Sequence, residues 1–309
     1  MRLWHKIQYG LLVGFCKAIG MLPYRVLYYG MVDVIYFFIY TLGRYRTSVV
    51  RDNLRRSFPD RSPEELKTVE RKFYKHLSEI FVDTVTMCSI SRKEIEQRFR
   101  FVNFREQEQR MEGKTWICAM AHYGSWEYTT NYKLFTDHDV AAVYRPLHNK
   151  AFDQFYHYAR SRFGTRPVPM NDIAKEIIRA EKERKKPLAV ALIADQTPPF
   201  HEIHHWFRFL NQPTPFFMGT EKLARKFRLP VYFLHIRKIK RGYYQAEFIE
   251  IYNGTDSVEP YEITNRYAAR LEEMIRESPE LWLWSHKRWK HKPPANAGLD
   301  KSCSSKPNA

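Results

Sequence analysis

The strongest constraint on the fold is a change of pattern that begins at Trp116. From there to Ile236, short apolar runs alternate with amphipathic stretches long enough to form helices. Parallel strands need crossover connections, so this alternation predicts an α/β fold with a mainly parallel or mixed central sheet flanked by helices. The apolar runs are residues 116–121, 140–144, 188–194 and 231–236, and the amphipathic stretches are 126–135, 151–163, 173–183 and 218–227.

Local signals predict three further elements. Residues 62–65 (Ser-Pro-Glu-Glu) combine an N-cap, a proline at the first helical position and a capping-box glutamate, so a helix should run from here to about Met87. Residues 243–251 alternate with period two and precede an Asn-Gly turn, which predicts an edge strand. Residues 261–277 should form a helix that ends before Ser278-Pro279.

The first 43 residues differ from the rest of the 309-residue chain. Apolar stretches at 7–22 and 26–42 each contain one charge, Lys17 or Asp33, so neither is a clean span of the ~20 apolar residues that a bilayer needs. Arginines follow at five positions between 44 and 56, which favours a cytoplasmic location for the remainder. We expect a membrane-inserted helix near residues 1–22 and a second helix at the interface or against the body. The alternatives are a signal peptide or two ordinary buried helices.

The net charge of +17 predicts an anionic partner, either nucleic acid, a phospholipid surface or an acidic protein. The basic segment 286–292, interleaved with Trp282, Trp284 and Trp289, suits nucleic acid or a membrane interface. The apolar amino-terminal stretches favour the membrane, so we expect no nucleic acid.

Metal and cofactor motifs are absent from the sequence. The four cysteines show no CxxC spacing, and the HxxHH pattern at 201–205 lacks a second ligand pair, so we expect no metal. No glycine-rich phosphate loop suggests a nucleotide cofactor. GxSxG is absent and Cys118 lies inside a predicted buried strand, so the sequence suggests no serine or cysteine nucleophile that would form a covalent intermediate.

Ionisable residues end three of the predicted strands: His122, Arg145 and Asp195. Ligands of open α/β sheets bind beyond the carboxyl ends of the strands, so these residues are candidates for a site. Glu127 follows His122 by five positions, which on a helix corresponds to a rotation of about 140°. The two side chains meet only if the chain bends between them.

Such a bend is available. Gly124 permits it, and Ser125 is a suitable N-cap for a following helix whose first turn would hold Glu127. A carboxylate there stays ionised and suits a group that orients an imidazole. The alternative is a satisfied histidine at a strand end.

The order of several motifs resembles the late acyltransferases of lipid A biosynthesis, from about residue 1 to residue 292. The spacing and sequence of the motifs follow that family's pattern. The motifs are Leu22-Pro23-Tyr24, Arg51-Asp52-Asn53-Leu54 with Phe58-Pro59, His122-x4-Glu127, Val143-Tyr144-Arg145-Pro146 with Asp153, Ala194-Asp195-Gln196, Gly219-Thr220 with Leu223-Ala224-Arg225, and residues 284–290.

The resemblance implies a glycerolipid acyltransferase-like fold in which His122 is a general base and Glu127 holds and polarises it. It implies a substrate-handling role for Arg145, with Asp153, Asp195 and Gln196 as further substrate-binding candidates. For Arg145 an ion pair with Asp153 or Asp195 is the alternative. Asp195 and Gln196 alternatively cap the loop that follows them.

It also implies partners and a location. The acyl donor would be acyl carrier protein and the acceptor a lipid A precursor or related glycolipid, at the cytoplasmic face of a bacterial inner membrane. Residues 1–43 would be the membrane anchor and interfacial helices, 44–292 the acyltransferase domain and 293–309 a disordered tail. The alternatives are an acyltransferase for a lysophospholipid or aminolipid, or a non-catalytic basic membrane-binding protein.

Overall fold

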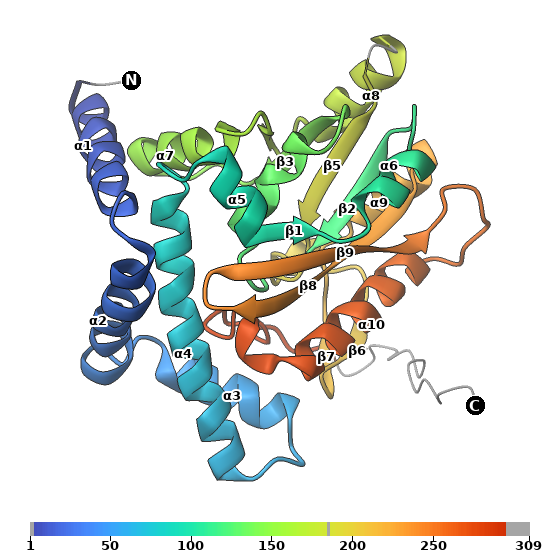
Figure 1. The fold of residues 1–309 in the computed structure, drawn as a ribbon. Helices are drawn as coiled ribbons and strands as arrows, with labels where there is room; N and C mark the ends of the chain where they lie inside the picture. The colour runs from blue at the N-terminus through green and yellow to red at the C-terminus, as the bar shows by residue number, and fades with distance from the viewer. Residues whose placement is uncertain (1–2, 184–185, 295–309) are drawn as a thin grey trace.

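The computed structural model describes residues 3–183 and 186–294, so the expected tail lies almost wholly outside the described residues. Helices and strands alternate along most of the chain (Figure 1). The α-helices are α1 (Leu3–Gly20), α2 (Val32–Tyr36), α3 (Thr47–Ser57), α4 (Pro63–Thr86), α5 (Arg92–Arg98), α6 (Phe104–Arg110), α7 (Lys150–Ser161), α8 (Ile173–Glu183), α9 (Gly219–Phe227) and α10 (Glu262–Glu277). The 3₁₀ helices are η3 (Trp126–Leu134), η4 (Phe200–Glu202) and η5 (Pro279–Leu281), and the π-helical segments are η1 (Val26–Met31) and η2 (Phe37–Leu42). The strands are β1 (Phe99–Phe101), β2 (Trp116–Met120), β3 (Asp139–Tyr144), β4 (Arg166–Pro169), β5 (Leu188–Ile193), β6 (Phe207–Phe209), β7 (Gln212–Thr214), β8 (Val231–Lys240) and β9 (Tyr243–Tyr252).

A seven-stranded sheet in the order β1-β9-β8-β2-β5-β3-β4 forms the centre. All neighbouring strands in it are parallel except the β8–β9 hairpin. The predicted strands and the mainly parallel α/β class are therefore confirmed. Strands β6 and β7 form a separate antiparallel pair.

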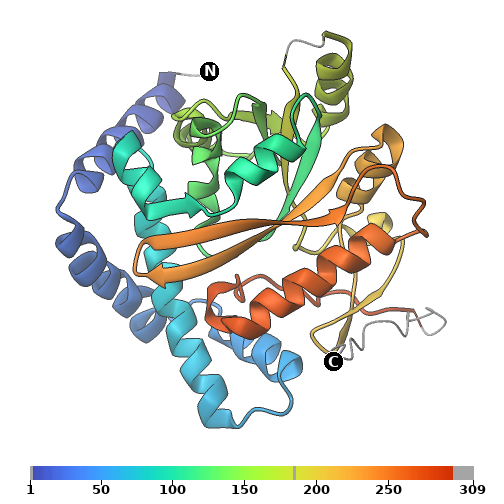
Figure 2. The ribbon, with the colours of Figure 1, turned by 45° about the vertical axis from the view of Figure 1, so that its right-hand side comes forward.

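Both faces of the sheet are covered, which explains why its strands are continuous apolar runs. Phe233 and Leu234 are consecutive in β8, and both are buried. Phe233 packs against Tyr267 of α10, whereas Leu234 lines a cavity together with Thr129 and Tyr132 of η3. Helix α10 thus covers one face and η3 the other; α10 runs along the hairpin in both views (Figures 1 and 2).

Helix α4 begins as its sequence predicts. The Ser62 hydroxyl accepts a hydrogen bond from the Glu65 amide, and the Glu65 carboxylate accepts one from the Ser62 amide. The helix ends at Thr86, one residue before the expected end.

Two expectations about secondary structure were wrong. β9 is not an edge strand, because the short β1 pairs with its free side. The segment after Ser125 is a 3₁₀ helix and not an α-helix, and the Ser125 side chain caps nothing there. Its sequence, Trp-Glu-Tyr-Thr-Thr-Asn-Tyr, is rich in aromatic and β-branched residues, which are poor formers of α-helix.

The amino-terminal segment packs against one side of the body, with α1 on α4 and α7 and the helical stretch Val26–Leu42 on α4 (Figure 1). Within the described residues, no individual helix has the length and apolar character to cross a membrane. Val26–Leu42 and Thr47–Ser57 satisfy that test only as a pair, bent by 88°. The membrane-inserted helix near residues 1–22 stays a prediction.

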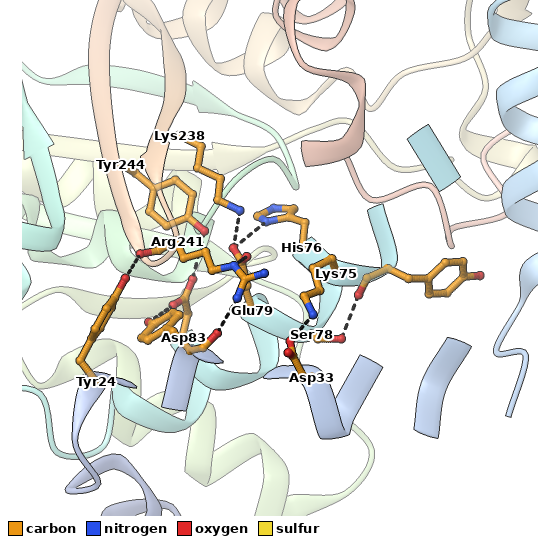
Figure 3. Close-up of polar contacts among 12 residues, drawn as sticks. Tyr24, Asp33, Lys75, His76, Ser78, Glu79, Asp83, Lys238, Arg241 and Tyr244 are labelled. Atoms are coloured by element: carbon orange, nitrogen blue, oxygen red, sulfur yellow. Dashed lines mark hydrogen bonds and ion pairs between the residues drawn. The ribbon is translucent and has the colours of Figure 1, made fainter. Parts of the chain in front are cut away.

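A buried polar network joins the amino-terminal helices to α4 and to the β8–β9 hairpin (Figure 3). The carboxylate of Asp83, 1% exposed, accepts hydrogen bonds from Tyr28 and, at 3.4 Å, from Tyr244. The Tyr28 hydroxyl also lies 3.2 Å from that of Tyr128 and accepts a hydrogen bond from Arg98 at 2.8 Å. Burial raises the pKa of Asp83 to about 6, despite the hydrogen bond from Tyr28.

We predict that Asp83→Asn makes the free energy of unfolding less dependent on pH. The pKa of Asp83 is higher in the folded state than its ordinary 3.8, so protonated Asp83 stabilises the folded state. This contribution to the free energy of unfolding is complete below pH 3.8 and is lost as the pH rises through about 6. Two pKa units correspond to about 3 kcal/mol. Denaturant unfolding at pH 4.5 and pH 7.5 measures the difference. Equal pH dependence in the variant and the wild type would contradict this account.

Candidate active site

The site lies at the carboxyl ends of β2 and β5, which are neighbours in the sheet. Met120 pairs with Ile193 at the last position of both strands. His122 and Asp195 each follow two residues later, so the parallel register brings them side by side. The sequence identified both as strand ends, and the pairing of β2 with β5 is what joins them.

The two side chains form a direct hydrogen bond. Nδ1 of His122 lies 2.7 Å from Oδ1 of Asp195, and Oδ2 of Asp195 accepts a hydrogen bond from the His122 backbone amide at 3.1 Å. A carboxylate acceptor at Nδ1 places the proton of a neutral imidazole on Nδ1, which leaves the lone pair on Nε2. The His122 side chain is 22% exposed, and the Gln196 amide nitrogen lies 3.3 Å from Nε2.

Burial would raise the pKa of the Asp195 carboxyl, but its neighbours outweigh burial. The charge of His122 and hydrogen bonds from His122 and Trp282 hold the pKa of Asp195 below its ordinary value. The third donor is the indole Nε1 of Trp282, at 2.8 Å. The carboxylate therefore stays ionised although the residue is only 2% exposed.

A sharp turn after His122 fixes the backbone. Gly124 has φ +58°, and a Cβ at this position would lie 2.9 Å from a methyl carbon of Ile236. The predicted bend at Gly124 is thus confirmed, and only glycine fits it. The carboxyl-terminal segment closes over the turn, because Gly124 donates to the Leu281 carbonyl at 3.0 Å and Leu283 donates to the His122 carbonyl at 3.1 Å.

Glu127 lies in the first turn of η3, as expected, but its hydrogen bonds go to Arg160 of α7. Nε and Nη2 of Arg160 contact the two carboxylate oxygens at 2.8 and 2.6 Å, a bidentate pair. Burial would raise the pKa of Glu127, whereas the charge of Arg160, its hydrogen bonds and the charge of His122 lower it below its ordinary value. Glu127 is therefore an ionised group whose field reaches His122. Direct support of the imidazole by Glu127 stays a prediction; the carboxylate that hydrogen-bonds it is Asp195.

The remaining candidates lie on the same edge of the sheet. Arg145 follows β3, is exposed, and has no ion pair among the described residues, so neither expected partner holds it. Asp153, in the first turn of α7, accepts a hydrogen bond from the Leu147 amide at 2.8 Å and so orders the loop after Arg145. Gln196 is half-buried beside His122.

Sequence reasoning missed the roles of Arg160 and Trp282. It assigned Trp282 and Trp284 to a membrane interface, which was wrong because they are 3% and 0% exposed and pack on each other. Arg288 is 1% exposed, and its guanidinium donates to the Pro215 carbonyl at 2.6 Å. Mixed aromatic and basic composition does not distinguish these buried anchors from an interfacial belt.

His286 is a second imidazole near the site that sequence reasoning did not single out. Its Nε2 accepts a hydrogen bond from the Thr197 amide at 3.2 Å. Burial and the charge of Arg288 lower the pKa of His286 to about 4, so it is neutral at pH 7. Asp195 and Thr197 are thus both tied to the 282–288 segment.

This arrangement suits proton abstraction. Nε2 of His122 lies at the rim of the site and carries a free lone pair, so it can accept a proton. The imidazolium formed in this way would be stabilised by the buried Asp195 carboxylate. A hydroxyl within reach of Nε2 would become a stronger nucleophile.

We predict that Arg160→Met destabilises the fold by about 3 kcal/mol, because it leaves Glu127 buried without its counter-charge. Thermal melting at pH 7 measures the loss. The double variant Arg160→Met with Glu127→Leu should recover most of it. The ion pair's contribution to the free energy of unfolding is complete above the ordinary pKa of Glu and disappears as the pH falls through the lowered pKa of Glu127. The destabilisation caused by Arg160→Met should therefore shrink toward pH 3. An undiminished loss in the double variant would show that packing of Arg160, and not its charge, matters.

The chain matches a known protein family. A search of curated proteins finds no match. The family model described as bacterial lipid A biosynthesis acyltransferase matches residues 2–291, nearly the whole chain. The protein therefore belongs to the bacterial lipid A biosynthesis acyltransferase family.

Proposed function

We propose that this protein transfers a fatty acyl chain from acyl-acyl carrier protein to a hydroxyl of a lipid A precursor. Family membership supports acyl transfer and a lipid A-type acceptor. The observation that carries the mechanism is the hydrogen bond between Nδ1 of His122 and Asp195, which leaves Nε2 as the base.

In the proposed reaction, Nε2 of His122 takes the proton of the acceptor hydroxyl while its oxygen attacks the thioester carbonyl. The tetrahedral intermediate then collapses, the C–S bond breaks, and the leaving thiolate takes the proton from the imidazolium. Asp195 stabilises the imidazolium throughout. Gln196 must move from Nε2 when the hydroxyl binds, because both need the same lone pair.

Two arginines have different tasks in this proposal. Arg145 is exposed at the crevice edge and is suited to a phosphate of the acceptor or to the oxyanion. Arg160 is held by Glu127, so it supports the site by fixing η3 against α7. Glu127 contributes through its negative field at His122.

We propose a position at the bacterial inner membrane, on its cytoplasmic face; the amino-terminal helices support the membrane contact. Helix α1 is apolar on two sides: Leu12, Val13 and Cys16 belong to a packed cluster with α7, whereas the opposite stripe is exposed. Such a stripe is costly in water and suits a bilayer interface. The exposed residues of the stripe are Leu3, Trp4, Ile7, Leu11 and Phe15, and the next segment adds Val34, Phe37, Phe38 and Leu42.

We predict that His122→Ala abolishes transfer and that Asp195→Asn lowers turnover by roughly a hundredfold or more, since the imidazole loses its orienting carboxylate. Detergent-purified protein would be incubated with mixed-chain acyl-acyl carrier proteins and a lipid A precursor, and the lipids analysed by mass spectrometry. A mass gain of one acyl chain in the wild type and none in His122→Ala supports the proposal. Transfer by folded His122→Ala protein at the wild-type rate would refute it.

We also predict that Leu11→Lys with Phe15→Lys moves protein from the membrane fraction to the soluble fraction of cell lysates. Both side chains are more than 60% exposed, so the fold should be unaffected. Equivalent changes at Met170 and Ile178, which are also exposed but lie outside the amino-terminal helices, serve as the control. Unchanged fractionation would exclude α1 as a membrane contact.

A further inference from the structure

The tip of the β8–β9 hairpin extends past the site on the same edge of the sheet. Strand β8 is parallel to β2, and continuing their register places Ile236 level with His122. The close approach of Gly124 to Ile236 agrees with this level. Lys240 is four residues further along, so the tip stands about 13 Å beyond His122. The tip is therefore on the same side of the sheet as the site.

The tip is basic and partly apolar. Residues 237–242 read Arg-Lys-Ile-Lys-Arg-Gly, and Ile239 is 56% exposed. Lys240 is exposed and lies over the Tyr243 ring at 4.2 Å, and no carboxylate pairs with it in the described part of the chain. An exposed isoleucine beside a lysine that has no ion pair suits a headgroup layer, where the apolar side chain can insert and the cation can meet phosphates.

The amino-terminal turn lies directly beside this tip. The Tyr24 hydroxyl donates a hydrogen bond to the Arg241 carbonyl at 2.7 Å (Figure 3). The Arg241 guanidinium lies over the Tyr29 ring at 5.0 Å. The two segments therefore share one surface, which we call the tip surface. Its exposed members are Met21, Leu22, Arg25, Val26, Tyr29, Ile239 and Lys240.

A buried carboxylate fixes the tip surface in place. Glu79 of α4 is 1% exposed and pairs with Lys238 and, at 3.7 Å, with Arg241 (Figure 3). Arg241 also donates to the Tyr28 carbonyl at 3.1 Å. At Gly242, φ is +65° and a Cβ would meet the Tyr28 ring at 2.5 Å, so the turn fits closely against η1. The hairpin and the amino-terminal helices are thus closely packed and joined by buried polar contacts.

We propose that the tip surface binds the anionic headgroup layer of a phospholipid bilayer and turns the crevice at the ends of β2 and β5 toward it. Lys240 and Arg25 would contact phosphates, Tyr29 would lie at headgroup depth, and Ile239 would insert below it. This inference rests on the proposed function, because only a lipid acceptor needs to reach the crevice from a bilayer. It adds a second contact to that of α1.

The test is binding of the full chain to vesicles with and without phosphatidylglycerol. Ile239→Asp with Lys240→Glu should weaken binding to phosphatidylglycerol vesicles roughly tenfold, since two favourable contacts become repulsive. Ile178→Asp with Lys182→Glu makes the same changes on exposed positions of α8, at the opposite edge of the sheet, and should bind like the wild type. Melting temperatures would confirm that both variants are folded.

A fluorescent label locates the contact independently of α1. A polarity-sensitive dye on Ile239→Cys should shift to the blue with phosphatidylglycerol vesicles, and the same dye on Ile178→Cys should not; Cys16, Cys88 and Cys118 are buried, and Cys303→Ser would be present in both. Equal vesicle binding by the tip variant and the wild type, or a dye that stays in water, overturns the proposal. Weaker binding of acyl carrier protein in place of vesicles would assign the surface to that protein.

Acyl transfer in detergent micelles separates this inference from the proposed function. The tip variant should retain wild-type transfer there, because its substitutions lie outside the site. Absence of transfer in the wild type would count against the proposed function, while the vesicle result would still decide the tip surface.

Discussion

The site depends on the hydrogen bonds that the Asp195 carboxylate accepts. It is buried, and it accepts hydrogen bonds from the imidazole and the backbone of His122 and from the indole of Trp282. His122 lies 73 positions and Trp282 87 positions away from Asp195 in the chain, so one charged group aligns the ends of β2 and β5 with the carboxyl-terminal segment. Strands β2 and β5 end at paired residues, and this register brings the carboxylate within hydrogen-bond distance of the ring and the backbone amide of His122.

A second buried carboxylate lies close by, and the structure gives the two different partners. Glu127 forms a bidentate ion pair with Arg160, whereas Asp195 faces an imidazole and an indole. The pKa values of both carboxyl groups lie below the ordinary range, for different reasons. At Glu127 the cause is the permanent charge of Arg160, and at Asp195 it is the charge of the His122 imidazole together with hydrogen bonds. A carboxylate without a permanent counter-ion gains most when the imidazole is protonated. Asp195 is therefore the better partner for a base that works by taking up a proton.

Much of the fold was predictable because it follows from local pattern. Strands that are covered on both faces are continuous apolar runs, and His122, Arg145 and Asp195 follow the ends of three such strands on one edge of the sheet. Strand β1 was missed because three residues leave almost no periodic signal. The H-x4-E spacing drew attention to a partner nearby in sequence, whereas the hydrogen-bonded partner of His122 lies 73 positions away.

Contacts between distant segments also explain the other misses. Arg160 lies within an amphipathic helix, and nothing in that helix indicates which of its basic residues turns inward to Glu127. The tryptophans and basic residues of the 282–288 segment have the composition of a membrane-interface belt, but the indoles of Trp282 and Trp284 are buried in the core. Burial depends on which segment covers them, and that is a property of the assembled chain.

The same buried polar network links the amino-terminal helices to the site. The Tyr28 hydroxyl of η1 contacts that of Tyr128, which follows Glu127 directly in η3, and Thr86 of α4 contacts Tyr128 as well, at 2.8 Å. These hydroxyls are buried, so separating them without new partners would cost about 1–3 kcal/mol for each group left unsatisfied. Helix η1 and the 3₁₀ helix that carries Glu127 are consequently held at a fixed distance. The hydrogen bonds of the Tyr128 hydroxyl therefore join the amino-terminal helices and α4 to the segment that carries Glu127.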